Sequence, residues 1–269
     1  MLKALEREKA ENVDAALYEL VAHELLRRLE FTPTFKPAYK ASANKKLSPD
    51  MDVMINGQKY IVDVFLTHNA IKTIKRGRDR FRLTVNQGEN AKNIHDKIIQ
   101  KCGKYASIQK PIILVVFLGD HNVELLDVSR ALYGAGLEDG WLKDKFPFGI
   151  ADFQREISSK FNQELPGGAI LPDEEGVPRC ANLSAVLACD WFDSLDKNRP
   201  GKRLYCIAFH HWQPNVPIPP ARFSNFREVV WSQNSSNSYD LRVINSFAAV
   251  AKFAQGDRLE FGNDSVGDS

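Results

Sequence analysis

Residues 49–66 read PDMDVMINGQKYIVDVFL, and this pattern predicts two antiparallel strands joined by a tight turn. The dipeptide Asn56-Gly57 is typical of a two-residue hairpin turn and separates two apolar runs of strand length. Asp50 precedes the first run, and Asp63 interrupts the second. Because an unpaired carboxylate is costly to bury in a strand, we expect Asp63 to bind a metal ion or another cation.

The segments around this hairpin predict an α/β core in which a mixed sheet lies between helices. Helices are expected at 12–29 and 89–106, and the second has apolar residues at helical spacing. Pro111–Leu118 is a continuous apolar run that predicts a buried central strand. The other expected elements are a proline-broken strand at 31–39, helices at 123–133 and 150–161, and strands at 183–189 and 203–209.

The first helix has apolar residues on two sides, which predicts that it packs between two layers. Leu17, Leu20 and Val21 mark one of these sides, and Ala22 and Leu25 belong to the other.

A chain of 269 residues can bury the core of one large domain with an extension. We expect a core at 1–165, an extension at 166–255 that packs on the same domain, and a frayed polar tail at 256–269. Residues 166–178 are rich in glycine and proline and predict a long exposed loop.

Composition favours an ordinary globular protein, with 26% charged and 43% apolar residues and a formal charge of +2. No run of the sequence has the length of a membrane span and the start has no apolar leader region, so we expect a cytoplasmic protein with no membrane partner. The cysteines show no metal-ligand spacing and predict free thiols in a reducing compartment. They are Cys102, Cys180, Cys189 and Cys206.

Three segments together carry a family resemblance: YELVAHELLRRLEF at 18–31, SPDMD at 48–52 and YIVDVF at 60–65. Their order and spacing resemble the PD-(D/E)XK nuclease superfamily, which includes restriction endonucleases and Holliday-junction resolvases. The resemblance covers about residues 12–120. It implies a restriction-endonuclease-like mixed β-sheet flanked by helices, with C-terminal helix and strand elaborations.

The same resemblance implies that Glu19, Asp50 and Asp63 ligate Mg²⁺ or Mn²⁺ and act as catalytic residues. Carboxylates that hold such an ion let it polarise a phosphate and lower the pKa of a bound water. The aromatic-Glu pattern of the family favours Glu19 as the helix ligand. Glu24 remains an alternative, although it can also pair with Arg27 or Arg28. Glu30 stands where the family has glycine.

Phe65 occupies the position at which the family has a lysine, on the same strand face as Asp63. One interpretation is that the lysine comes from the second helix, where the periodicity favours Lys101 first and Lys97 second. The other interpretation is that the site binds nucleic acid without cutting it.

A basic segment follows the second strand of the hairpin and predicts contacts with a phosphate backbone, although a solvated loop is the alternative. Its members are Lys72, Lys75, Arg76, Arg78, Arg80 and Arg82. His210 and His211 are adjacent and face opposite ways on a strand, so we interpret them as a structural or surface feature.

The function predicted from these patterns is a Mg²⁺-dependent phosphodiesterase, specifically an endonuclease whose partner is DNA. The main alternative is a catalytically inactive nucleic-acid-binding or assembly protein that retains the fold. A third hypothesis is an interaction module with no nucleic-acid role, in which the basic segment does not face the carboxylates. Homodimer formation stays open.

Overall fold

The computed structural model describes residues 2–42, 45–67, 87–119, 123, 125–133, 168–170, 177–193, 202–223, 226–233, 239–244, 250–253 and 260–262. The helices are α1 (Leu2–Arg28), α2 (Gln87–Tyr105) and α3 (Leu125–Tyr133), with a 3₁₀ turn η1 at Ala106–Ile108. The strands are β1 (Thr34–Phe35), β2 (Tyr39–Ser42), β3 (Lys45–Leu47), β4 (Met51–Ile55), β5 (Gln58–Thr67), β6 (Ile112–Leu118), β7 (Leu183–Asp193), β8 (Lys202–His210), β9 (Arg227–Gln233), β10 (Tyr239–Ile244), β11 (Val250–Phe253) and β12 (Glu260–Gly262).

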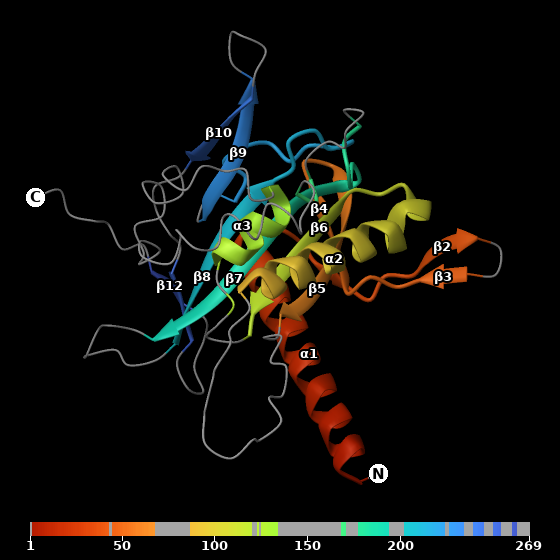
Figure 1. Cartoon of the computed structure of the whole chain (residues 1–269). Helices are drawn as coiled ribbons and strands as arrows, with labels where there is room; N and C mark the ends of the chain where they lie inside the picture. Colours follow the sequence, from red (N-terminus) through yellow and green to blue (C-terminus); the bar gives the residue numbers. More distant parts are fainter. Residues whose placement is uncertain are drawn as a thin grey trace, which may run out of the picture.

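The fold is a mixed ten-stranded sheet with helices on both faces, accompanied by a separate β2–β3 hairpin (Figure 1). Helices α2 and α3 share one hydrophobic core with one face of the sheet, and α1 shares a second core with the other face. The expected mixed sheet flanked by helices is therefore confirmed.

The predicted hairpin is confirmed as β4 and β5, which pair antiparallel with Met51 opposite Val62. Asn56 and Gly57 both have positive φ, 50° and 79°. A type I′ turn requires positive φ at both central residues, and asparagine and glycine adopt it most readily.

Strand β6 is the predicted buried central strand, and every residue from Ile112 to Leu118 is buried. It pairs in parallel with β5 on one edge and with β7 on the other. Alternate residues enter the two cores: Leu114 faces α2 and α3, and Val115 faces α1. A strand covered by helices on both faces has no polar face, which explains the unbroken apolar run.

The C-terminal strands belong to the same sheet, because β7 pairs antiparallel with β8. The second edge of β8 is shared by two strands. Residues 202–205 pair with β11, and residues 207–209 pair in parallel with β9. β12 then pairs with β11, and β10 pairs with β9.

Helix α1 differs from its prediction in length and in burial. It begins at Leu2, and its N-terminal half projects away from the sheet (Figure 1). Val21, Ala22, Leu25 and Leu26 are buried, whereas Leu17 and Leu20 are 49% and 58% exposed. The prediction that both apolar sides pack between layers is wrong for Leu17 and Leu20. Tyr18 packs on Phe117 at the same level of the helix, so the two leucines are exposed because they point away from the sheet.

The segment predicted as an exposed loop is described at 168–170, where it is buried and the prediction is wrong, and at 177–178, where Val177 is 53% exposed. The Ala169 amide donates to the Ala131 carbonyl at 2.9 Å, and the Ile170 amide donates to the Leu132 carbonyl at 3.2 Å. The last carbonyls of a helix lack partners within it, so this segment satisfies the end of α3.

Other predictions fall partly outside the described residues. The expected helix at 150–161 lies wholly outside them. Within the expected frayed tail, β12 is paired with β11, so that part of the prediction is wrong. The proline-broken strand at 31–39 is the short β1 followed by the start of β2. Among the described residues, no helix combines the length and the apolar character that crossing a membrane requires.

Candidate active site

Two carboxylates lie on neighbouring strands at the open end of the hairpin. The β4–β5 register pairs Met51 with Val62, so its continuation places Asp50 opposite Asp63. The amide of Val64 donates a 2.7 Å hydrogen bond to Asp50 Oδ2. Like charges directly across two strands destabilise a sheet, so this arrangement favours a nearby cation.

The pKa of Asp50 depends on charged and polar groups from several elements of the fold. The pKa of Asp50 is raised to about 6, mainly by burial and also by the charges of Asp63 and Glu19. The Val64 amide and the ammonium of Lys101 act in the opposite direction. Three carboxylates and one lysine, contributed by α1, the hairpin and α2, therefore lie within electrostatic reach of one another.

Asp63 is 1% exposed and receives its polar partners from one face of α2. The Tyr105 hydroxyl donates to Oδ1 at 2.7 Å, and the Lys101 ammonium contacts Oδ2. Lys104 Nζ lies 4.0 Å from Oδ1. Positions 101, 104 and 105 are related by i+3 and i+4, the spacing that places side chains on the same side of a helix.

Tyr105 was not predicted as a site residue. The sequence placed it in the apolar stripe of the second helix, and it is indeed fully buried. Its hydroxyl nevertheless donates a hydrogen bond to the Asp63 carboxylate. Burial raises the pKa of Tyr105, and the charge and hydrogen bond of Asp63 raise it further, so the hydroxyl remains a donor.

The two candidate lysines occupy different places. Lys97 Nζ lies 5.5 Å from the ring centroid of Phe65 and donates to the Leu66 carbonyl at 3.1 Å. Burial lowers the pKa of Lys97, and the charge of Lys101 lowers it further. Only Lys101, of these two, contacts Asp63. Helical periodicity gave the same order of preference, and the catalytic role of Lys101 remains a prediction.

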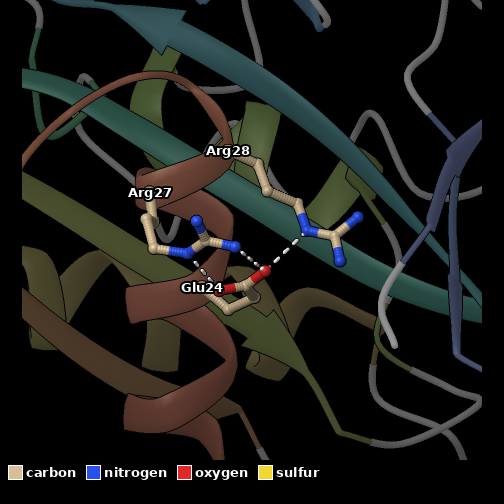
Figure 2. Close-up of polar contacts among 3 residues, drawn as sticks. All are labelled: Glu24, Arg27 and Arg28. Carbon is tan, nitrogen blue, oxygen red and sulfur yellow. Dashed lines mark hydrogen bonds and ion pairs between the residues drawn. The ribbon is translucent and has the colours of Figure 1, made fainter. Parts of the chain in front are cut away.

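The two candidate glutamates of α1 are also distinguished by their contacts. Glu24 accepts hydrogen bonds from Arg27 Nε at 2.7 Å and from Arg28 Nε at 2.7 Å. Figure 2 shows that Arg27 contacts the carboxylate through two nitrogens and Arg28 through Nε alone. The hydrogen bond from Arg27 is the main cause that lowers the pKa of Glu24 to about 2. Glu19 instead influences Asp50, and it has a weaker ion pair with Lys36 at 3.6 Å.

A further acid on β4, Asp52, is buried and already neutralised. The Tyr39 hydroxyl donates to Asp52 Oδ2 at 2.8 Å, and Lys59 Nζ lies 3.3 Å from the same oxygen. These contacts tie the β2–β3 hairpin to β4, so Asp52 has a structural role.

The adjacent histidines are both buried, so the surface interpretation is wrong and the structural one holds. His210 Nε2 lies 2.7 Å from Glu228 Oε2, and His211 Nε2 lies 2.7 Å from the Arg179 carbonyl. The two side chains reach different partners, as opposite strand faces require.

The basic segment at 72–82 lies outside the described residues. Within the described ranges, no three His, Cys, Asp or Glu side chains are placed to hold a metal ion by themselves. The structure thus brings Asp50, Asp63 and Lys101 together, with Glu19 at the margin. No protein-family model and no curated protein matches the chain.

Proposed function

We propose that the chain is a metal-dependent phosphodiesterase, an endonuclease that acts on DNA and holds Mg²⁺ or Mn²⁺ with Asp50 and Asp63. The observation that carries the proposal is the contact of the Lys101 ammonium with Asp63, which lies opposite Asp50 in the β4–β5 register. It supplies from α2 the cation that Phe65 cannot supply from β5. The order of α1, the β4–β5 hairpin, α2 and β6 supports a restriction-endonuclease-like architecture as part of the same proposal.

The residues at this position fit a magnesium site of two protein ligands. Mg²⁺ keeps several waters and is usually bound by one or two carboxylates together with substrate phosphates. Burial is the main cause that raises the pKa of Asp50, and repulsion by Asp63 and Glu19 adds to it. A bound divalent cation would relieve the part that comes from repulsion. Asp63 Oδ2 is buried and contacts the Lys101 ammonium, so a bound ion would share this oxygen with Lys101.

In this proposal each residue of the site has a separate role. The bound ion supplies Lewis-acid charge and a water of lowered pKa. Tyr105 fixes the orientation of Asp63 through Oδ1, and Lys101 holds positive charge where the phosphate must approach. The Lys104 and Lys36 side chains are 39% and 69% exposed near the carboxylates, so they can contact phosphate oxygens on either side.

A second candidate function rests on the absence of a three-ligand group in the described ranges and on Phe65. With Asp63 already paired to Lys101, the same residues can serve as a buried ion pair in a nucleic-acid-binding or assembly protein that does not cut.

The test is cleavage of a panel of plasmid, single-stranded and structured DNA with Mg²⁺, Mn²⁺ or EDTA. We expect metal-dependent cutting that Asp63→Asn abolishes. Asp52→Asn should leave cutting intact, since Asp52 on the neighbouring strand is already bound by Tyr39 and Lys59. Binding in EDTA without cutting under either ion would establish the second function instead. Neither binding nor cutting would favour the interaction module.

A further inference from the structure

The four cysteines form two pairs in very different surroundings. Cys189 on β7 and Cys206 on β8 are register partners, and their sulfur atoms lie 3.2 Å apart. Both are fully buried in the core beneath α1. Burial raises the pKa of Cys206, so this pair is a sealed dithiol with little reactivity.

The second pair joins α2 to the turn that precedes β7. Cys180 packs against the core cluster that contains the buried Cys102, and Cys180 is itself only partly buried. The Asn182 side-chain amide donates to the Cys102 carbonyl at 3.0 Å, and the Leu183 amide donates to the Cys180 carbonyl at 2.7 Å. The turn that carries Cys180 is therefore hydrogen-bonded to α2 at Cys102 itself.

The two thiols of this pair differ in their chemistry. The hydrogen bond from Cys102 lowers the pKa of Cys180, and the charge of Arg179 lowers it further. The hydrogen bond to Cys180 and burial raise the pKa of Cys102. A partly exposed thiol that favours the thiolate is the reactive kind, and its buried partner can resolve the product. Cys180 also has a φ of 48°, a conformation uncommon for a residue with a side chain.

We propose that Cys180 and Cys102 form a peroxide-reactive pair that closes to an intramolecular disulfide. In the first step the Cys180 thiolate attacks one oxygen of hydrogen peroxide, the O–O bond breaks, and a sulfenic acid and hydroxide form. In the second step the Cys102 sulfur, after losing its proton, attacks the sulfenic sulfur. The S–S bond forms, the S–O bond breaks, and water leaves. The two cysteines are oxidised and one peroxide is reduced.

The test uses the reduced full-length chain, treated with hydrogen peroxide under native conditions, blocked with N-ethylmaleimide and analysed by non-reducing peptide mass spectrometry. We expect a Cys102–Cys180 peptide that dithiothreitol releases, while Cys189 and Cys206 remain alkylatable after unfolding. Because the new bond links distant parts of the chain, the oxidised protein should also unfold at a higher temperature.

Two variants separate the two steps, and far-ultraviolet circular dichroism checks that each is folded. Cys102→Ser should accumulate a sulfenic acid on Cys180 that dimedone captures, whereas Cys180→Ser should give no adduct on Cys102. Cys189→Ser is the matched control and should leave the disulfide yield unchanged. Oxidation of Cys189–Cys206 before Cys102–Cys180, or a stable Cys180 adduct without a disulfide in the wild type, would overturn the proposal. These readouts do not depend on nuclease activity.

Discussion

The hydroxyl of Tyr105 donates a 2.7 Å hydrogen bond to Oδ1 of Asp63, which joins the end of α2 to the middle of β5. Tyr105→Phe should therefore lower the free energy of unfolding by about 1.5–3 kcal/mol, because the acceptor is a buried carboxylate. Tyr60→Phe is the matched control, since the Tyr60 hydroxyl donates to the neutral Pro217 carbonyl at 3.2 Å. Denaturant unfolding measures both. Equal losses in the two variants would show that the Asp63 contact has no special strength.

Lys101→Met removes the ammonium from a carboxylate that is 1% exposed. We expect a loss of about 1–3 kcal/mol in unfolding free energy, because Asp63 is left as a buried unpaired charge. Adding Asp63→Asn to the variant should recover most of this loss. Under the proposed function, the cleavage rate should also fall at least about tenfold, equivalent to about 1.4 kcal/mol of barrier.

Lys97→Met is the control for that experiment, since its ammonium contacts the Leu66 carbonyl rather than a carboxylate. It should retain the cleavage rate. A large loss with Lys97→Met and none with Lys101→Met would transfer the catalytic role to Lys97.

Asp50 predicts a pH-dependent stability difference. Folding raises its pKa to about 6, so between its ordinary value of about 4 and this value the native state binds the extra proton, and stability falls as pH rises. Asp50→Asn removes the penalty. The variant should unfold at a higher temperature than the wild type near pH 8, with the difference vanishing near pH 4.

Mg²⁺ should stabilise the wild type near pH 8 and have less effect on Asp50→Asn, since a ligand of the native state raises stability by mass action. Thermal unfolding with and without the ion measures this. In the pH experiment, a stability difference between the wild type and Asp50→Asn that does not change with pH would contradict the assignment of the raised pKa to Asp50.

Glu228 and Glu24 offer a comparison of a buried and a surface acid. Glu228 is 0% exposed and accepts from the Ala221 and Phe223 amides at 3.1 and 2.8 Å, besides its contact with His210. Glu228→Ala should cost at least about 3 kcal/mol, since several buried partners lose their acceptor. Glu24→Ala should cost less than about 1 kcal/mol, because its arginine pairs are partly exposed. Denaturant unfolding of both variants decides the order.

The sequence permitted prediction of features that depend on short-range pattern. The Asn56-Gly57 turn and the buried strand β6 depend on local backbone preference and apolar patterning. The position of Lys101 follows from helical periodicity alone, because one helix face must meet the sheet. Asp63 was identified because a carboxylate in a buried strand needs a partner.

The features that escaped prediction depend on contacts between distant segments. Tyr105 reads as a core residue, and nothing local reveals that its hydroxyl reaches Asp63. Cys180 comes near Cys102 only because the turn before β7 packs on α2. Leu17 has the pattern of a buried helix position, and only the packing of its neighbour Tyr18 on Phe117 reveals that the other side of α1 faces the sheet.

The division of β8 between β9 and β11 also matters for solubility. A long free strand edge is a template on which other molecules can add, and this leads to aggregation. Because β11 and β9 each occupy a separate portion of one β8 edge, an incoming strand would have to displace a native neighbour before it could pair along that edge. The sharing of this β8 edge by β9 and β11 therefore protects the sheet from intermolecular strand exchange.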